Sequence, residues 1–478
     1  MKLTQLISSL DDVQVFGTGE IEISSISDDS RKVKKGSLFV AIRGQTFDGN
    51  SFIPQVIKSG AKVVVTERIT DKNLLGQATF VVVKDARRAL GQLASKWYGN
   101  PSRKMKVVGV TGTDGKTTTV NLIYNILKES GKKVGMVSTI NARIGKREID
   151  TGFHVTNPDQ ILLQSLLSDM VKEACKYAVL EVTSHGLDQE RVAGVNFDLG
   201  VLTNITHEHL DYHKTYENYL LAKAKLFKLS KTAILNEDDT SYETLLKELK
   251  GKVKIIGYNS RSLSGKLLKA VNSRFPEKYN RLNAAAAIKT AQLLGIEQKY
   301  IIKAIESFPR LVGRMEEIKN NKNIKIIIDF AHTPNALENV LSTIKEKTPR
   351  RLIVVFGSAG ERDVNKRALM GAVAAKLAEI SIITAEDPRS EGVNKIIAEI
   401  EKGIKSNSRV KYYKIPERGE AIYFAINKIA EKGDTVVICG KGHERSMCYG
   451  SVEYPWSDQE AAKLALKGQV KKIIRNEK

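Results

Sequence analysis

Short runs of apolar, β-branched residues recur along this chain, and most of them lead directly into a polar or glycine-rich loop. Clear examples are Val107–Thr111, Tyr177–Val182, Ile324–Ile328 and Thr435–Cys439. Segments with helical periodicity, such as Val120–Leu127, separate these runs. This alternation predicts an α/β fold with parallel sheets. The loops after the strands would then share one sheet edge, which is where ligands bind in such folds.

The chain has 478 residues, enough for about three domains of ordinary size. Turn-forming residues interrupt the pattern at Asn100-Pro101-Ser102 and at Phe308-Pro309-Arg310, which are candidate linkers. We therefore predict three domains of the α/β class. They are a small N-terminal α/β domain over 1–103, a central P-loop nucleotide-binding domain over 104–308 and a C-terminal Rossmann-like domain over 309–478.

The strongest local motif is the segment Gly112-Thr113-Asp114-Gly115-Lys116-Thr117-Thr118, which lies between a predicted strand and a predicted helix. In such a turn, backbone N–H groups surround a phosphate, Lys116 reaches the terminal phosphates and the Thr117 hydroxyl suits Mg²⁺. The usual pattern has a further glycine where this chain has Val110. A glycine-rich turn that binds nothing is the alternative, but the strand–turn–helix context favours a nucleoside triphosphate.

Two later strands end in residues that suit a metal–phosphate site. Glu181 closes the apolar run that begins at Tyr177, a position where nucleotide-binding sheets hold a Mg²⁺-binding acid. The run Phe197–Ile205 leads into Thr206–His213, a segment with three histidines and two acids. Zinc is a competing ligand, but no cysteine accompanies these histidines, so magnesium fits better. A solvated polar loop is the simplest alternative reading of this segment.

Composition excludes several classes of protein. Hydrophobic residues make up 42% of the chain and charged residues 27%, which is typical of globular domains rather than disorder. No apolar run approaches the ~20 residues of a membrane helix. The N-terminus lacks the apolar core of a secretory signal, so we expect a cytoplasmic protein without a membrane partner. Cys175, Cys439 and Cys448 show no metal-ligand spacing and should be buried free thiols.

The net charge of +22 raises the question of nucleic-acid binding. The basic residues are spread along the chain, however, and aromatic residues account for only 6% of it. We therefore interpret the charge as a solvated surface that favours a polyanionic small substrate, and we expect no nucleic-acid partner. By composition, Lys223 and Lys225 of the predicted helix Glu217–Leu229 are simply surface lysines.

Taken in order, these motifs resemble those of the Mur ligase family along nearly the whole chain. The resemblance is carried by Asp29-Ser30-Arg31, Gly112–Thr118, Glu181–Leu187, His209–His213, Gly313-Arg314-x-Glu316, Asp329–Pro334 and Gly440–Glu444. It implies a monomeric, ATP-driven amide ligase of peptidoglycan precursor synthesis. Such an enzyme would add an amino acid to UDP-N-acetylmuramoyl-L-alanyl-D-glutamate through an acyl phosphate.

The resemblance also implies a role for each residue that matches a family motif. Catalysis would involve Lys116, Glu181, His209 and Lys223, with Lys223 as a carbamate. Mg²⁺ would be held by Thr117, Glu181, His209 and that carbamate. ATP would be bound by Gly112, Thr113, Asp114, Gly115, Lys116, Thr117, Thr118, Asn283, Arg314 and Asp329. The UDP-sugar would contact Ser30, Gln45, Thr46, Phe47, Thr156, Asn157, Thr183, Gln189 and Arg191. Because these residues span all three domains, catalysis should need domain closure.

By the same resemblance, the incoming amino acid would contact Arg367, Glu386, Asp387, Pro388, Arg389, Gly440 and Glu444. Relatives that select meso-diaminopimelate usually carry Asp-Asn-Pro-Arg, whereas this chain has Glu386-Asp387-Pro388-Arg389. Arg389 favours diaminopimelate, because a planar guanidinium matches the distal carboxylate. Asp387 could instead neutralise Arg389 and admit the ammonium group of L-lysine. Diaminopimelate is our expectation, with L-lysine as the alternative.

Other positions depart from the family pattern. Asn157 stands where a second threonine is common, and Glu277 stands where a glycine usually precedes Tyr279. The stretch Lys252–Asn280 is short, so the central domain could lack peripheral strands. The remaining alternatives are a related ligase acting on folate or another muramyl intermediate, a nucleic-acid-binding ATPase and an inactive scaffold.

Overall fold

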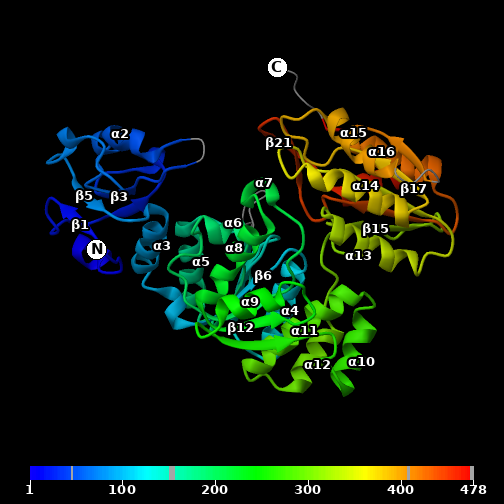
Figure 1. Cartoon of the computed structure of the whole chain (residues 1–478), viewed down its shortest axis with the longest axis horizontal. Coiled ribbons are helices and arrows are strands. Elements are labelled where there is room, and N and C mark those ends of the chain that lie inside the picture. The colour runs from blue at the N-terminus through cyan, green and yellow to red at the C-terminus, as the bar shows by residue number, and fades with distance from the viewer. Residues whose placement is uncertain (45–46, 150–156, 406–409, 474–478) are drawn as a thin grey trace.

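The computed structural model describes residues 1–44, 47–149, 157–405 and 410–473. It contains three β-sheets flanked by helices and one separate two-stranded hairpin. Figure 1 shows the first domain, in blue, and the third domain, in yellow to red, on opposite sides of the central domain. The predicted three-domain α/β fold is confirmed. None of the helices in the described part of the chain has the length and apolar content needed to span a bilayer.

The first domain is built on a five-stranded sheet. The strand order is β1 (Gln14–Phe16), β5 (Thr79–Val82), β4 (Val63–Thr66), β3 (Ser37–Val40) and β2 (Ser25–Ser27). Only β1 is antiparallel to its neighbour. The helical elements are α1 (Leu3–Ile7), η1 (Ser30–Lys32), η2 (Gly49–Phe52), α2 (Ile53–Lys58), η3 (Lys72–Leu74) and α3 (Ala86–Trp97). Buried Leu90 and Leu93 of α3 pack on Val63 and Val65 of β4, which covers one face of the sheet.

The central domain has an eight-stranded sheet. Its order is β13 (Lys254–Tyr258), β12 (Ser230–Asn236), β11 (Phe197–Leu202), β6 (Lys106–Thr111), β10 (Tyr177–Glu181), β7 (Val134–Val137), β8 (Ala142–Ile144) and β9 (Arg147–Ile149). The strands from β13 to β7 are parallel, and β8 and β9 join as antiparallel edge strands. The phosphate-loop strand β6 lies in the middle of the sheet, between β11 and β10.

Helices cover both faces of this sheet. They are η4 (Pro101–Lys104), α4 (Lys116–Glu129), α5 (Gln160–Lys172), α6 (Ser184–Asp188), α7 (Leu210–His213), α8 (Tyr216–Lys228), α9 (Tyr242–Leu249), α10 (Gly265–Arg274), α11 (Lys278–Leu293) and α12 (Gln298–Glu306). One apolar core joins α4, α11 and α12 to the sheet, and a second joins α5 and α8 to its other face. Figure 1 shows α10, α11 and α12 gathered together at one end of the domain.

The third domain is a doubly wound sheet in the order β14 (Glu316–Glu317), β15 (Lys325–Asp329), β19 (Thr435–Cys439), β16 (Leu352–Phe356), β17 (Ile380–Ile383) and β18 (Lys411–Lys414). The hairpin consists of β20 (Ser446–Tyr449) and β21 (Val452–Pro455). The helices are α13 (Pro334–Lys345), α14 (Asn365–Leu377), α15 (Val393–Ile404), α16 (Arg418–Phe424), the π-helix η5 (Ala425–Ile429) and α17 (Asp458–Leu466). All sheet neighbours except β14 are parallel, so the loops after β15, β16, β17 and β19 share one edge.

The start of α13 and the state of the cysteines both follow from the sequence. Pro334 begins α13 after Thr333, whose hydroxyl accepts a hydrogen bond from the Ala336 N–H, as expected for a helix start. The three cysteines are buried free thiols, as predicted.

Arg418 is a buried charge that ties several elements of the third domain together. Its guanidinium pairs bidentately with Asp458, at 2.8 and 2.7 Å, and both side chains are fully buried. The same guanidinium donates to the carbonyls of Ala385 and Cys439, which follow β17 and end β19. Arg418 therefore holds the cleft ends of two strands against α17.

Replacing Arg418 with alanine should lower the stability of the third domain by about 3–5 kcal/mol, because Asp458 would remain buried without its partner. Urea unfolding of the full chain measures this change, and hydrogen exchange assigns it to the third domain. Arg350→Ala removes an exposed guanidinium from the same domain and should have little effect. Equal stability of the two variants would contradict this role for Arg418.

Candidate active site

The phosphate loop occupies the turn between β6 and α4. Gly115 caps α4 with φ +82°, and a Cβ at this position would lie 2.2 Å from Asn283 Oδ1, so glycine is required on two counts. Lys116 begins the helix, and its Nζ donates to the carbonyls of Gly112 and Thr113 at 3.1 and 2.8 Å. The lysine therefore lies folded over the loop that a phosphate would enter.

A carboxylate and hydroxyl groups meet beside this loop. Thr117 Oγ1 donates to Glu181 Oε1 at 3.0 Å. Glu181 is the carboxylate that ends β10. Thr139 contributes both its hydroxyl and its N–H to the same carboxylate, at 2.8 and 3.0 Å. This cluster of hard oxygen atoms is the chemistry that Mg²⁺ prefers.

His209 lies at the start of α7 with a left-handed backbone, φ +57°. Burial lowers the pKa of His209 well below its ordinary value, and the neighbouring His185 lowers it further. The rings of His185 and His209 are 4.6 Å apart, and burial also lowers the pKa of His185 to about 4. Both imidazoles are therefore neutral at pH 7, the form that coordinates metals. No group of three or more His, Cys, Asp or Glu side chains is arranged for a metal among the residues that the structure describes.

Lys223 is buried, unlike the surface lysine that its helix composition suggested. Its Nζ donates to the Gly112 carbonyl at 2.6 Å and lies 4.5 Å from the centre of the Tyr219 ring. Burial lowers the pKa of Lys223 well below its ordinary value, and the nearby charge of Lys116 adds to the effect. Lys225, on the same helix, is exposed and pairs with Asp188. A buried lysine side chain thus reaches the phosphate loop from α8.

The third domain contacts the central domain across the phosphate loop. Asn335 Nδ2 donates to Asp114 Oδ2 at 2.9 Å, and Arg314 Nη2 donates to Thr117 Oγ1 at 3.4 Å. Lys366 and Glu208 form a buried ion pair at 3.2 Å. These contacts place the two domains in a closed arrangement around one cleft.

The cleft has a volume of about 400 Å³. Its lining includes the predicted phosphate-loop and nucleotide residues Thr113, Asp114, Gly115, Lys116, Thr117, Thr118, Asn283, Arg314 and Asp329. Asp329 accepts hydrogen bonds from the N–H groups of Met315 and Ala331, which fixes its carboxylate at the end of β15. Burial raises the pKa of Asp329.

A second cavity, of about 870 Å³, lies between the first and central domains. Ser30 and Phe47 line it from the first domain. Gln189 and Arg191 line both this cavity and the main cleft, so the two spaces adjoin at these side chains. Gln45, Thr46 and Thr156, also predicted here, lie outside the described residues.

Asn157 and Thr183 form a hydrogen-bonded cluster at the end of strand β10. Asn157 Nδ2 donates to the Glu181 carbonyl at 2.7 Å, and its Oδ1 accepts from the Thr183 N–H and hydroxyl. Arg191 donates to the Asn157 carbonyl at 2.7 Å. Asn157 therefore supports the backbone beside Glu181, and it also lines the main cleft.

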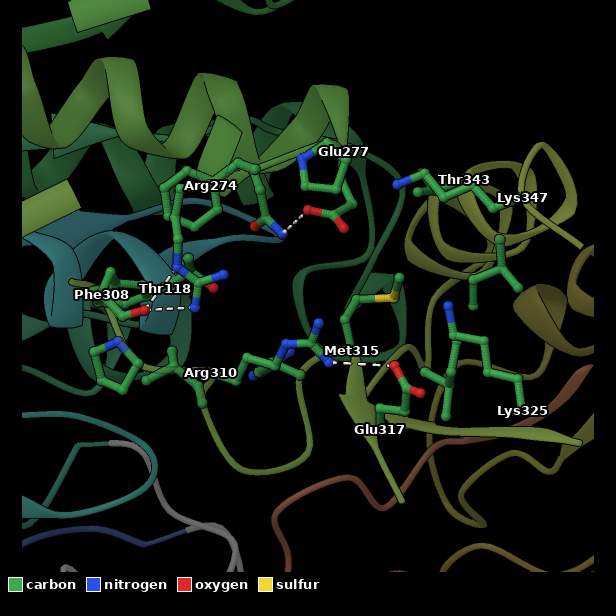
Figure 2. Close-up of a pocket in the computed structure, with 18 residues that line it drawn as sticks. Thr118, Arg274, Glu277, Phe308, Arg310, Met315, Glu317, Lys325, Thr343 and Lys347 are labelled. Carbon is green, nitrogen blue, oxygen red and sulfur yellow. Dashed lines mark hydrogen bonds and ion pairs between the residues drawn. The ribbon is translucent and has the colours of Figure 1, made fainter. Parts of the chain in front are cut away.

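A third, smaller cavity of about 150 Å³ lies at the linker between the central and third domains. Thr118, Asn280, Arg314 and Met315 line both this cavity and the main cleft. Figure 2 shows Arg274 and Phe308 on one side and Glu317, Lys325 and Lys347 on the other. Arg274 donates to the Phe308 carbonyl at 2.7 Å, and Arg310 pairs with Glu317 at 3.6 Å. The linker is therefore bonded to both domains that it joins.

The far wall of the main cleft carries the residues predicted to meet an amino acid. Glu386, Asp387, Arg389 and Glu444 line it. Asp387 Oδ1 accepts from Lys441 Nζ at 2.8 Å and from the Cys448 N–H at 3.0 Å. Lys441 also pairs with Glu444 at 2.5 Å. A buried lysine is thus the charge partner of Asp387.

Comparison with known proteins decides the family. The Mur ligase family catalytic domain matches residues 22–98, the Mur ligase middle domain matches residues 110–291, and the Mur ligase glutamate ligase domain matches residues 313–442. The UDP-N-acetylmuramoyl-L-alanyl-D-glutamate--2,6-diaminopimelate ligase of Parabacteroides distasonis is 39% identical over 481 residues, which covers 96% of this chain and 98% of that protein. The chain belongs to the Mur ligase family.

Other Mur ligases agree with this assignment. The protein of the same name from Caldanaerobacter subterraneus is 38% identical and covers 98% of this chain and 99% of its own length. A solved structure of a UDP-N-acetylmuramoyl-L-alanyl-D-glutamate--2,6-diaminopimelate ligase superposes with a TM-score of 0.64 at 27% identity, covering 98% of this chain and 99% of that one. The MurF ligase of Thermotoga maritima in complex with ADP, at 20% identity and a TM-score of 0.59, covers 93% of this chain and 97% of its own and shares the fold.

Arg367, which the Mur ligase resemblance assigned to the amino-acid site, lies behind the cleft in this structure. Its side chain is fully buried and pairs with Glu391 at 2.9 Å and Glu399 at 2.5 Å. It also donates to the Ala359 carbonyl, and it is not among the residues that line the cleft. Arg367 therefore supports the loop after β16 from behind. Pro388 and Gly440 also contribute backbone shape near the wall rather than polar side chains.

Several cleft residues of this Mur ligase were not predicted as site residues from the sequence. They are Thr139, Asn204, Asn335, Arg362 and Lys366. Asn335 follows Pro334 at a helix start after a strand, which is a usable signal. Lys366 is adjacent to Arg367 on α14, and the side chain of Lys366 rather than that of Arg367 lines the cleft.

Proposed function

We propose that this protein is an ATP-dependent amide ligase that joins 2,6-diaminopimelate to UDP-N-acetylmuramoyl-L-alanyl-D-glutamate. The observation that carries the proposal is that two cavities adjoin. A cavity large enough for a nucleotide-sugar meets, at Gln189 and Arg191, the cleft that contains the phosphate loop. The wall with Arg389 and Glu444 faces the same space, so three substrates can meet at Lys116.

The reaction follows from the chemistry of these groups. A carboxylate is a poor acyl donor, because oxide would have to leave. Transfer of the γ-phosphoryl group of ATP to the glutamate carboxylate gives an acyl phosphate, and an amine then displaces phosphate. Bringing a carboxylate to a triphosphate requires positive charge between them, which the Lys116 ammonium supplies at the mouth of the loop.

Magnesium fits the residues beside the phosphate loop. The hydroxyl–carboxylate contact of Thr117 and Glu181 offers oxygen ligands, and His209 is a neutral imidazole. Burial favours the uncharged form of the Lys223 amine, the form that adds CO₂ to give a carbamate, which would offer further oxygen atoms. We propose that Thr117, Glu181, His209 and carbamylated Lys223 hold Mg²⁺, which would neutralise phosphate charge when bound.

We assign the large cavity to the UDP-sugar, with Ser30, Phe47, Gln189 and Arg191 as its contacts among the described residues. The shared edge at Gln189 and Arg191 would then lead the peptide arm of this substrate toward Glu181. Because ATP and nucleotide-sugars are cytoplasmic metabolites and one chain supplies every wall, we propose a cytoplasmic, monomeric enzyme.

The choice of diaminopimelate rests on Arg389 and on the partner of Asp387. Arg389 lines the cleft and is only partly exposed. Because Lys441 neutralises Asp387 within the wall, the charge of Arg389 is available to a carboxylate of the substrate. L-Lysine lacks that distal carboxylate and is the less favoured amine.

Arg389→Ala should reduce kcat/KM for meso-diaminopimelate by about 10- to 100-fold, the expected cost of losing a charge-assisted bidentate contact. The rate with L-lysine should change much less, because lysine has no carboxylate at this position. Steady-state phosphate release with each amine measures the difference. Arg350→Ala, an exposed position in the same domain, serves as the control. Equal losses with both amines would contradict selection by Arg389.

The ligase assignment itself is tested by ADP release from ATP and Mg²⁺. We expect release only when UDP-N-acetylmuramoyl-L-alanyl-D-glutamate and an amine are both present. Stimulation by DNA or RNA without these substrates would instead indicate a nucleic-acid-dependent ATPase.

A further inference from the structure

We propose that Glu386 is the general base that takes a proton from the ammonium group of the incoming amino acid. This inference rests on the proposed ligase function and adds a step to it. Amino acids carry their amines as ammonium ions at neutral pH, and an ammonium ion has no lone pair with which to attack an acyl phosphate. The reaction therefore needs a proton acceptor on the amino-acid side of the cleft.

Glu386 lies on that side of the cleft. It follows β17 at the shared edge of the third-domain sheet, is only 6% exposed and lines the main cleft. Its Oε2 is buried and has no hydrogen-bond partner among the described residues. Gly440 adjoins it with φ +113°, and a Cβ there would lie 3.0 Å from Oε2. A buried acceptor without a partner is costly, so such a group commonly has a functional use.

The charged neighbours of Glu386 are each bound to another acid. Lys366 on α14 pairs with Glu208, and Arg418 on α16 pairs with Asp458. Lys441, after β19, pairs with Asp387 and Glu444. These cations stabilise the ionised form of Glu386 without a hydrogen bond to its Oε2 among the described residues.

Burial has the largest effect on the pKa of Glu386. It raises the pKa of Glu386 to about 7, with Asp387 acting in the same direction and Lys366, Lys441 and Arg418 acting against it. A carboxyl group in this range is both ionised and basic enough near neutral pH to accept a proton, which is the condition for efficient general-base catalysis.

Glu386 shares the cleft with the groups that would meet the two ends of the substrate. Arg389, three residues farther along the same loop, would hold the distal carboxylate of diaminopimelate. Lys366, also in the cleft, connects through its ion pair to Glu208, whose Oε1 lies 3.9 Å from His209 Nδ1. With the distal carboxylate at Arg389, the amine end of the substrate would point toward the phosphate side of the cleft that Glu386 lines.

Amide formation begins when the ammonium group gives one proton to Glu386. The freed nitrogen lone pair then forms the C–N bond at the acyl carbon. The C–O bond to phosphate breaks, and its electron pair leaves with the phosphate. The second proton lost from nitrogen goes to the departing phosphate, and Glu386 later returns its proton to solvent.

Glu386→Gln tests the proposal, because glutamine keeps the shape and hydrogen-bonding capacity but cannot accept the proton. We expect amide formation with diaminopimelate to fall by about 100-fold or more at pH 7. Hydroxylamine is largely uncharged at this pH and needs no base, so hydroxamate formation from the acyl phosphate should stay near the wild-type rate. Glu338→Gln, an exposed acid of the same domain, is the matched control.

The pH profile gives a second readout. In the wild type, kcat/KM should fall as the pH drops below about 7, because protonated Glu386 cannot accept a proton. In Glu386→Gln this inflection should disappear, and the rate should instead rise with pH as free amine accumulates. Glu386→Asp, which keeps a carboxylate, should recover part of the activity, and this separates loss of the base from loss of the fold.

Three results would overturn the inference. Near-normal amide formation by Glu386→Gln would show that the carboxyl group acts only as a neutral contact. Parallel loss of amide and hydroxamate would place Glu386 in acyl-phosphate formation, while leaving the ligase function intact. Failure of the wild-type protein to form either product would refute the proposed function itself, and the base with it.

Discussion

Lys116→Ala is expected to lower ADP formation by about 1,000-fold, one of the two largest losses for a single side chain in this cleft. The ammonium group of Lys116 lies over the phosphate loop, held by the carbonyls of Gly112 and Thr113. In the variant, nothing on α4 can replace that charge between the triphosphate and the attacking carboxylate. The initial rate of ADP release with all three substrates measures the effect.

The fold should survive this substitution, because the Lys116 side chain contacts only its own loop among the hydrogen bonds described. Lys128→Ala, at the exposed last turn of the same helix, should keep the wild-type rate and controls for changes in α4. Turnover by Lys116→Ala within a few-fold of the wild type would remove this lysine from the mechanism.

Lys223→Ala should have an effect of similar size, about 1,000-fold, if its carbamate completes the magnesium site. The burial of the Lys223 amine beside Gly112, which favours its uncharged form, is the structural basis for this expectation. Two measurements apply: the rate of ADP release, and ¹³C NMR in labelled bicarbonate, where the wild type should show a carbamate signal that the variant lacks.

Lys225→Ala is the matched control for Lys223, since both lysines lie on α8 but Lys225 is exposed and pairs with Asp188. This variant should retain both the rate and the carbamate signal. A fully active Lys223→Ala enzyme would contradict the account, as would a wild-type protein without a carbamate signal.

Much of the fold could be predicted because its central strands are buried on both faces. Strands such as β6, β10 and β16 are continuous apolar runs, and the residues that follow them face the cleft because parallel strands end at one edge. Glu181 and Asp329 were predicted in this way, and both line the cleft. Their assigned roles remain predictions.

The sequence did not reveal contacts that depend on how helices turn and how domains meet. Adjacent helical residues point about 100° apart, so Lys366 faces Glu208 across the domain interface while Arg367 turns back toward Glu391. The burial of Lys223 depends on α8 packing beside the phosphate loop, which no local pattern encodes. The pairing of Asp387 with Lys441 joins residues 54 positions apart. This pairing disfavours the alternative in which Asp387 neutralises Arg389.

The most direct test of the central claim is a competition experiment with the purified protein. ATP, Mg²⁺ and UDP-N-acetylmuramoyl-L-alanyl-D-glutamate are incubated with equal concentrations of meso-diaminopimelate and L-lysine, and the nucleotide-sugar products are identified by mass spectrometry. The account predicts that the diaminopimelate adduct predominates and forms with stoichiometric ADP. Absence of any amide product, or a predominance of the lysine adduct, would contradict it.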